Sequence, residues 1–359
     1  MHHRTPRLEI YPDRIAENAR TVYALVHGHG AQVAAVGKVT CAHPAVITAM
    51  ASAGADMVAD SRITNLMESS HLGTGLPQML LRIPAPSAAH DVVRWADITL
   101  NSSLQSLQVL SQAAQMAGTT HQAILMIDIG DLREGVWPDM AVDVVVAAAK
   151  LPNLELIGVG ANLACYGGVI PSPENMQMLI DVRDAARDAS GLALELISGG
   201  NSSSLPMIAN DQMPAEINHF RIGETVALGR NVLDRSAWPG TRQDTFTLVT
   251  EIVELERKPS VPIGLRAQNA FGETVEFDDR GRRLRAICNL GRQDTNVDGI
   301  VPLDPGISVI GASSDHLILD VEDAVYPVAL GAEVSFVPNY GALLGLSTSA
   351  YVDKVVRRG

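Results

Sequence analysis

One lysine lies in a sequence context that favours covalent chemistry. Lys38 follows the apolar segment Val33–Val36, and it is one of only four lysines in a chain that holds 27 lysines and arginines. An arginine cannot form an imine, whereas a desolvated lysine can lose its proton and attack a carbonyl group. The position of Lys38 at the end of a predicted buried strand therefore suggests that it forms a Schiff base. From this feature alone, the alternative is a side chain that reaches from the strand end to the surface.

A second candidate is the Gly/Ser-rich segment Ser198-Gly199-Gly200-Asn201-Ser202-Ser203-Ser204. The backbone N–H groups of such a loop, placed before a helical turn, are suited to binding a phosphate group. A strand-end lysine together with a late phosphate loop points to pyridoxal 5′-phosphate as the cofactor. For the loop alone, a flexible turn without a ligand is the alternative.

Short apolar runs alternate with segments of helical pattern over the first two thirds of the chain. Eight strand–helix units over about 215 residues are what a (β/α)8 barrel requires, and continuous apolar runs suit parallel strands covered on both faces. A doubly wound open sheet is the competitor, but no G-x-G-x-x-G motif follows any of these runs. The predicted strands are Val33–Val36, Met57–Ala59, Met79–Ile83, Ile98–Leu100, Ala123–Ile129, Leu156–Val159, Leu194–Ile197 and His219–Ile222, and the helical segments include Pro44–Ala53, Leu104–Ala117, Met140–Ala149 and Glu174–Ala189.

The two ends of the chain have a different pattern. Leu8–Tyr11 alternates like an opening strand, and Asp13 is expected to cap a helix that runs to about Val26. From Asp244 onward the chain is β-branched, rich in turn residues and nearly free of helical patterns. We therefore expect a barrel domain over residues 11–235 and a mostly antiparallel β domain over residues 236–359 together with 1–10. The expected strands of the second domain include Phe246–Leu255, Ala286–Leu290, Ser308–Gly311, His316–Val321 and Glu333–Val337.

Composition limits the classes of binding partner and the cellular compartment expected for this protein. The 359 residues carry a formal charge of −13, which argues against nucleic acid or an anionic membrane as the main partner. No run of 18 apolar residues occurs, and the N-terminal residues lack the apolar core of a signal peptide. The three cysteines are odd in number and widely spaced, so a disulfide framework is not expected. The expected compartment is the cytoplasm.

Polar residues fall at the positions where a barrel places its reactive groups. In a (β/α)8 barrel these groups project from the carboxyl ends of the strands and from the loops that follow. The candidates near the ends of the predicted strands and on the loops after them are Lys38, Asp60, Arg82, Asn101, Asp128–Arg133, Asn162 with Cys165 and Tyr166, Ser198–Ser204 and Arg221–Glu224.

Taken in order, these motifs resemble a known family. The chain is similar to the fold-type III pyridoxal-phosphate racemases, whose type member is alanine racemase, and most of all to their ornithine racemase-like branch. The matching motifs run along nearly the whole chain. They are Val36-Gly37-Lys38, Ala59–Ile63, Asp128–Gly135, Asn162–Gly167, Ser198–Ser204, Arg221–Glu224, Gly291–Thr295, Gly311–His316 and Tyr340–Leu344.

The resemblance implies a role for each matching residue. Lys38 would hold the cofactor as an imine and move the Cα proton on one face of the substrate. Arg221 would face the pyridine nitrogen, and because a guanidinium does not give up its proton, that nitrogen would stay neutral. Ser202 and the amide of Gly223 would bind the phosphate, joined by Tyr340 from the second domain. The other implied cofactor contacts are Arg133, Asn162, Ser198, Asn201 and Glu224.

The chain also departs from the family pattern. The catalytic tyrosine that the family supplies from the partner subunit is replaced by Phe271, in Asn269-Ala270-Phe271-Gly272. The phosphate-contacting tyrosine four residues after the lysine is Ala42. The modified lysine of the fifth strand is Met126, and the histidine after the sixth strand is Asn162. A racemase needs an acid/base on each face of Cα, so the second group is unassigned. The candidates are His316 and Asp315, acting in trans, with Tyr166 and Cys165 as weaker ones.

The resemblance implies a homodimeric racemase that interconverts the L- and D-forms of a free amino acid. A basic amino acid such as ornithine, or else alanine, is the expected substrate, with Glu134, Asp131 and Asp294 as guesses for its terminal ammonium. One alternative is a metal-dependent D-amino-acid lyase or aldolase. Pro338–Ala342 offers neither the histidine nor the cysteine that its metal site needs, so no metal is expected. A non-catalytic pyridoxal-phosphate-binding protein is the other alternative.

Overall fold

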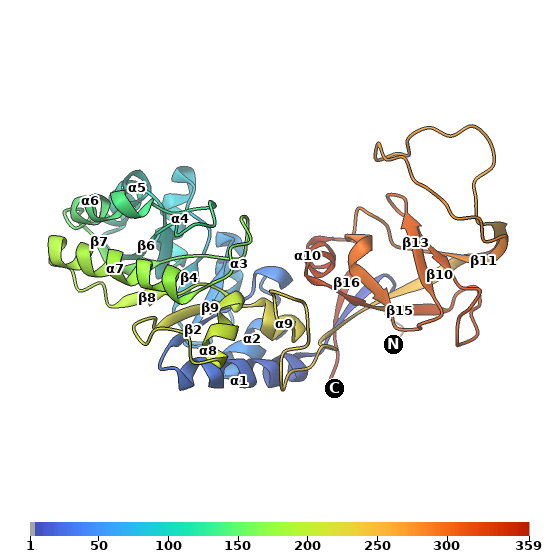
Figure 1. Ribbon diagram of the computed structural model, residues 1–359, viewed down its shortest axis with the longest axis horizontal. Coiled ribbons are helices and arrows are strands. Elements are labelled where there is room, and N and C mark those ends of the chain that lie inside the picture. Colours follow the sequence, from blue (N-terminus) through green and yellow to red (C-terminus); the bar gives the residue numbers. More distant parts are fainter. Residues whose placement is uncertain (1–3, 359) are drawn as a thin grey trace. The chain divides into compact units, whose positions relative to one another are not determined.

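The computed structural model describes residues 4–358. The chain divides into two compact units, and each is considered by itself. One unit is Pro12–Gln243, and the other combines the chain up to Tyr11 with the chain from Asp244 onward. Figure 1 labels the elements of both units.

The first unit is a closed barrel of eight parallel strands, which confirms the predicted fold class. Apolar strand residues, among them Ala34, Val36, Met79, Leu100 and Met126, form one buried cluster. Three of the strands end in the polar residues Asp60, Asn101 and Ser198, at the end where a barrel carries its reactive groups. The strands are β2 (Gln32–Val36), β3 (Met57–Asp60), β4 (Gln78–Leu80), β5 (Ile98–Asn101), β6 (His121–Met126), β7 (Leu154–Gly160), β8 (Leu196–Ser198) and β9 (His219–Ile222).

One helix precedes the first barrel strand, and the others lie after later strands of the barrel. The first begins at Pro12, so Asp13 lies in its first turn and is not the cap that the sequence predicted. Proline suits this position because its missing N–H has no partner there in any helix. The helices are α1 (Pro12–Gly28), α2 (Pro44–Ser52), α3 (Ile63–Ser70), α4 (Ala89–Trp95), α5 (Leu104–Ala117), α6 (Pro138–Ala148), α7 (Pro173–Ser190), α8 (Leu205–Ala209) and α9 (Glu224–Leu228), with short 3-10 turns η1 (Lys38–Thr40), η2 (Pro86–Ala88) and η3 (Ser202–Ser204).

The second unit is built around an eight-stranded sheet. Its main path runs β12-β15-β10-β11-β14-β13, with antiparallel pairing throughout, and β1 joins β10. The exception to antiparallel pairing is β1 with β16, which are parallel. The strands are β1 (Arg7–Ile10), β10 (Phe246–Pro259), β11 (Arg282–Cys288), β12 (Ile300–Pro302), β13 (Ser308–Ala312), β14 (Leu317–Asp320), β15 (Glu333–Pro338) and β16 (Asp353–Val356), and η4 spans Val297–Gly299.

One helix of this unit was not expected from the sequence. α10 covers Tyr340–Thr348, where the sequence predicts almost no helix. Its residues are mostly apolar or small, so no polar face marks a helical period. Asn339 caps it by accepting the backbone N–H of Ala342 at 3.0 Å.

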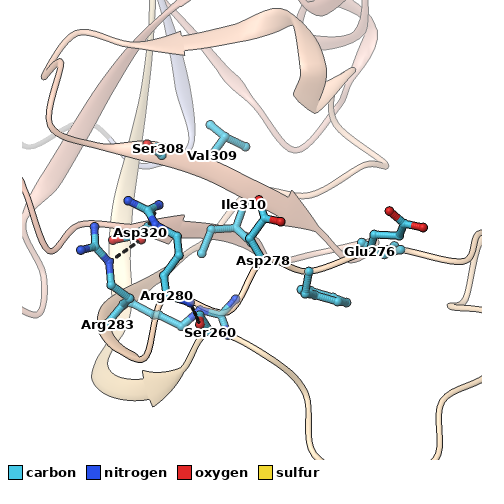
Figure 2. Close-up of a pocket in the computed structure, with 12 residues that line it drawn as sticks. Ser260, Glu276, Asp278, Arg280, Arg283, Ser308, Val309, Ile310 and Asp320 are labelled. Carbon is cyan, nitrogen blue, oxygen red and sulfur yellow. Dashed lines mark hydrogen bonds and ion pairs between the residues drawn. The ribbon is translucent and has the colours of Figure 1, made fainter.

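The same unit holds a cavity of about 210 Å³ between β11, β13 and β14 and the chain that precedes β11. Figure 2 shows its polar wall, where Arg283 contacts Asp320 and Arg280 lies beside Ser260. These groups already pair with one another, because Asp320 accepts from both arginines at 2.9 and 3.3 Å. No residue predicted for the active site lines this cavity.

Candidate active site

Lys38 lies on a tight turn immediately after β2. The carbonyl oxygen of Gly37 accepts three hydrogen bonds, from Thr40 N and Thr40 Oγ1 at 3.0 Å each and from Ala42 N at 3.1 Å. Cys41 and Ala42 follow with positive φ angles of 51° and 52°, a conformation that costs free energy for residues with a Cβ. The backbone at Lys38 is therefore held in one arrangement by its neighbours.

The Lys38 side chain is exposed rather than desolvated, which corrects the expectation of a buried amine. The reason is its position on η1, two residues beyond the last residue of β2, at the open end of the barrel. Two carboxylates lie close to Lys38, Asp60 at the end of β3 and Glu224 at the start of α9. Burial raises the pKa of each, and the positive charge of Lys38 opposes that rise. The amine therefore faces an acidic side of the barrel mouth.

Asp60 is fully buried and keeps one oxygen without a partner. Its Oδ1 accepts the backbone N–H of Arg62 and the side-chain amide of Asn65, both at 2.9 Å. Its Oδ2 is buried and has no hydrogen-bond partner among the described residues. Burial raises the pKa of Asp60 to about 6, although the two hydrogen bonds and the charge of Lys38 act in the opposite direction. From the sequence, Asp60 was predicted only to be a polar residue at the end of a strand, with no specific role.

The Gly/Ser segment forms a compact turn that brings N–H groups of two loops together. Asn201 begins η3 by accepting the N–H of Ser203 at 2.8 Å. The buried Ser202 Oγ accepts the N–H groups of Gly223 and Thr225 at 3.4 Å each, near the outer limit for a hydrogen bond. These donors are therefore only weakly satisfied.

Two further observations test whether this turn fits a phosphate group. Ser203 Oγ is buried and has no partner among residues 4–358. A side chain at Gly223 would bring a Cβ within 2.9 Å of Val36 Cβ, so the close approach of the two loops requires glycine. Weakly bonded N–H groups, a spare hydroxyl and a glycine backbone match the needs of a bound phosphate.

Arg221 is a buried cation on β9 that contacts only neutral acceptors. Its Nη1 donates to Ser198 Oγ, and its Nη2 donates to the carbonyl of Ala161 at 2.8 Å and to Asn162 Oδ1 at 3.4 Å. Burial lowers the pKa of Arg221 to about 10, with Arg133 adding to that effect and Glu134 opposing it. The guanidinium therefore remains charged at neutral pH.

His219, two residues before Arg221 on the same strand, is a part of this network that sequence reasoning missed. Its Nδ1 lies 2.7 Å from Ser198 Oγ, and burial lowers its pKa to about 3, helped by the charge of Arg221. Residues i and i+2 of a strand point to the same face. The spacing in His219-Phe220-Arg221 could have placed both side chains inside the barrel.

The asparagines predicted for the site connect the ends of β7 and β8. The side-chain amide of Asn201 donates to Asn162 Oδ1 at 3.2 Å and to the carbonyl of Leu163 at 2.9 Å. Asn162 Nδ2 is buried without a partner among the described residues. Together with its contact to Arg221, this makes Asn162 the link between the guanidinium and the Gly/Ser turn.

Arg133 stands in a charged cluster on the loop after β6. It pairs with Glu134, and its Nη1 donates to Cys165 Sγ at 2.8 Å. Burial acts to lower the pKa of Arg133, but the hydrogen bond and charge of Glu134, together with Cys165, outweigh it and raise the pKa. Arg133 also acts electrostatically on Arg221.

The remaining predicted residues belong to the β unit. His316 and Asp315 are exposed on the β13–β14 turn, and Asp315 accepts from the side chain of Gln293 at 2.8 Å. No hydrogen bond joins His316 to Asp315 within the described chain. Tyr340 is the first residue of α10.

Phe271, which the sequence motif led us to expect in place of the family tyrosine, lies on a compact turn of the same unit. Asn269 Oδ1 accepts the N–H groups of Phe271 and Glu273 at 2.9 and 3.0 Å. The guanidinium of Arg292 lies 4.4 Å from the Phe271 ring centroid and pairs with Glu273 at 2.9 Å.

The structure thus brings Lys38, Glu224, Ser198, Ser202, Arg221, Gly223, Asn162, Asn201 and Arg133 to one end of the barrel. A family model described as "Alanine racemase, N-terminal domain" matches residues 10–230. Ornithine racemase of Acetoanaerobium sticklandii is 40% identical over 350 residues, which cover 97% of this chain and 99% of that protein. The chain belongs to the alanine racemase family. It is therefore an amino-acid racemase, and the resemblance found in the motifs is confirmed.

Two further comparisons place this racemase within the family. Lysine racemase of Thermotoga maritima is 37% identical over 350 residues, covering 98% of each chain. The crystal structure of alanine racemase from a D-cycloserine-producing Streptomyces lavendulae matches with a TM-score of 0.77 over 100% of this chain and 98% of that chain. At 18% identity, that match supports the fold alone. Enzymes of this family use pyridoxal 5′-phosphate and act on free amino acids.

No group of three or more His, Cys, Asp or Glu side chains within residues 4–358 is arranged to hold a metal ion. Every helix in that range is too short or too polar to cross a membrane.

Proposed function

We propose that this racemase interconverts the enantiomers of a free basic amino acid, of the size of ornithine or lysine, with pyridoxal 5′-phosphate bound to Lys38. The observation that carries the proposal is the placement of three functional groups on neighbouring strands. β9 pairs with both β2 and β8, so Arg221 lies between the lysine turn and the Gly/Ser turn. These three places supply an amine for the aldehyde of that cofactor, a cation for its ring nitrogen and N–H donors for its phosphate.

In this proposal the cofactor withdraws electrons from the substrate Cα, and the protein residues hold it and move protons. Ser202, with the N–H groups of Gly223 and Thr225, binds the phosphate. Arg221 donates a hydrogen bond toward the ring nitrogen and keeps its own proton. Ser198, Asn162 and Asn201 hold Arg221 and the Gly/Ser turn in place, while Arg133 balances negative charge at the substrate end.

Proton transfer at Cα requires one group on each face of the substrate. Lys38 serves one face, and the carboxylates of Asp60 and Glu224 lie close enough to interact electrostatically with its amine. His316, or Asp315 beside it, serves the other face and comes from a second copy of the chain, with Tyr340 reaching the phosphate from the β unit. The enzyme in this proposal is a homodimer.

The preference for a basic substrate is supported by the relatives, one an ornithine racemase and the other a lysine racemase. All three acidic residues considered for the terminal ammonium have partners within the protein instead. Asp131 is buried and accepts backbone N–H groups, and Asp294 accepts Ser349 Oγ at 2.8 Å and the N–H of Gly291 at 3.2 Å. Glu134 is engaged with Arg133. None of the three is therefore assigned to the substrate.

A chiral screen of L-amino acids, including ornithine, tests the proposal with the cofactor-loaded enzyme in deuterium oxide. We expect ornithine or lysine to gain deuterium at Cα and to form the opposite enantiomer without a keto acid. Lys38→Ala should lose both this activity and the visible absorption of the bound cofactor. Lys38→Arg is the matched control, because it keeps the charge but cannot form an imine. Racemisation by Lys38→Arg at the wild-type rate would contradict the assignment.

A further inference from the structure

We propose that His219 and Ser198 are positioning residues that hold Arg221 in one orientation while leaving its charge uncompensated. The proposal concerns a hydrogen-bonded chain inside the barrel, Arg221–Ser198–His219, whose members all lie on β8 and β9. Its geometric part, the hydrogen-bonding and protonation of these three side chains, depends on the structure alone. Its catalytic part, their effect on the reaction products, rests on the proposed function.

The direction of each hydrogen bond follows from the chemistry of its members. A guanidinium can only donate, so Ser198 Oγ accepts from Arg221 Nη1. The serine hydroxyl hydrogen is then free to go to its other neighbour, His219 Nδ1, at 2.7 Å. An imidazole that accepts at Nδ1 is neutral and carries its hydrogen on Nε2. In the series Arg221–Ser198–His219, each residue therefore donates its hydrogen bond to the next, in the direction away from Arg221.

The burial of His219 supports this assignment. The residue has no exposed surface, and a second cation so close to Arg221 would be strongly disfavoured. His219 Nε2 is also buried and has no partner among the described residues. An unpaired buried N–H destabilises the fold, and an apolar side chain of similar size would avoid that cost. What histidine provides here is the acceptor Nδ1, which fixes the serine hydroxyl.

A neutral acceptor has a different effect on Arg221 from that of a carboxylate. A carboxylate at this place would form an ion pair and cancel the charge that the guanidinium presents to the barrel mouth. The acceptors found are Ser198 Oγ, the carbonyl of Ala161 and Asn162 Oδ1, all of them uncharged. The charged side chains that act on Arg221 from farther away are Glu134 and Arg133, which have opposite signs.

The consequence for the reaction concerns where the proton returns. A fixed, charged donor facing the ring nitrogen would keep that atom unprotonated, so the negative charge left at Cα would spread less into the ring. The proton then returns to Cα, which gives racemisation. If Arg221 could turn away, water would reach the ring nitrogen. A proton returned to the cofactor side, followed by hydrolysis, would then release a keto acid and leave the substrate amino group on the cofactor.

Nuclear magnetic resonance of the cofactor-free wild-type protein tests the geometric part. Long-range ¹H–¹⁵N correlations of ¹⁵N-histidine protein report the tautomer of each imidazole, and His219→Gln identifies the signal that belongs to His219. We expect a neutral imidazole with its hydrogen on Nε2 at every pH from 5 to 8, because burial lowers the pKa of His219 to about 3. Titration within this range, or a hydrogen on Nδ1, would overturn the proposal whether or not the chain proves to be a racemase.

The catalytic part is tested with four variants of the cofactor-loaded enzyme. His219→Leu and Ser198→Ala each break the chain, and loss of one net hydrogen bond should raise the ratio of keto acid to racemised product about tenfold. The double variant should show no more than either single one, because both act through the same contact. His219→Gln, whose amide oxygen can accept from Ser198, should restore most of the wild-type ratio and absorption spectrum.

The matched control is His121 on β6, a second buried histidine bonded to a hydroxyl. Its Nε2 lies 3.0 Å from Thr99 Oγ1, and burial lowers its pKa to about 4. It starts its strand at the end of the barrel opposite the site residues. His121→Leu should therefore lower the unfolding temperature without changing the product ratio. Equal ratios for His121→Leu, His219→Leu and the wild type, in folded proteins, would show that His219 is merely structural.

Discussion

The carboxylate of Asp131 accepts the backbone N–H of Tyr166 at 3.0 Å and so ties the loop after β7 to the loop after β6. Its Oδ1 also accepts the N–H groups of Cys165 and Val169, at 3.4 and 3.2 Å. Gly167 packs so closely that a Cβ there would lie 2.6 Å from Asp131 O. The two loops, which carry Arg133 and Asn162, therefore form one body, and the role of Asp131 is structural.

Asp131→Ala should separate these loops. Three N–H groups would lose a charged acceptor, which corresponds to about 2–4 kcal/mol of unfolding free energy. We expect the loss in urea denaturation, together with a higher KM because Arg133 is no longer held. Asp131→Asn keeps one acceptor oxygen and should lose about half as much. An Asp131→Ala protein as stable as the wild type would contradict the structural role.

Asp60 makes stability fall as pH rises. Its folded pKa of about 6 lies above the ordinary value of 3.8, so the folded state binds more protons than the unfolded state between those limits. The stability present below pH 3.8 is therefore lost as the pH rises through 6, by about 3 kcal/mol in total. Asp60→Asn cannot ionise and keeps the oxygen that accepts from Arg62 and Asn65, so this part of the pH dependence should disappear.

The same variant should separate stability from activity. At pH 8, Asp60→Asn should be more stable than the wild type by about 1–3 kcal/mol, since no buried charge remains. Its kcat should fall, because Lys38 loses a neighbouring negative charge. Denaturation curves and initial rates at pH 4, 6 and 8 measure both effects. A wild-type pH profile of stability in Asp60→Asn would show that another group titrates in this range.

Gly223→Ala should weaken the binding of the cofactor. The added Cβ would lie 2.9 Å from Val36 Cβ and 3.0 Å from Val36 O, so the loop that carries the phosphate donors must move. We expect at least a tenfold rise in the cofactor Kd, measured by absorbance titration. Gly28→Ala is the control, because a Cβ there meets nothing within 4 Å. Unchanged affinity in Gly223→Ala would argue against a phosphate at this turn.

The barrel could be predicted from the sequence because buried parallel strands are continuous apolar runs bounded by polar residues. The run His219–Ile222, for example, coincides with β9. The burial and hydrogen bonding of the residues at the open end of the barrel were harder to predict. Whether Lys38 is buried depends on how η1 leaves the strand, and the unpaired oxygen of Asp60 depends on where α3 begins, neither of which leaves a local pattern.

In the β unit the limits of prediction have a different cause. α10 was missed because an apolar helix packed against a sheet has no polar face to mark its period. The parallel pairing of β1 with β16 joins residues that are far apart in the sequence, such as Leu8 and Lys354. Strand order of this kind is set by packing of the whole unit, and nothing in either short segment indicates it.

His316 remains the candidate for the second proton carrier, and its replacement tests whether the β unit takes part in the reaction. The side chain is exposed on the β13–β14 turn, whose backbone is held by Ser313, since His316 N donates to Ser313 Oγ at 3.1 Å. His316→Gln therefore preserves the turn and removes the imidazole. We expect proton exchange at Cα to fall at least tenfold for one enantiomer and to change little for the other, because Lys38 still serves its own face.

Asp315→Asn, whose amide can still contact Gln293, should leave exchange from both enantiomers unchanged if His316 is the carrier. If that variant instead shows the asymmetry, Asp315 is the carrier, and equal wild-type exchange in both variants would exclude this turn from proton transfer.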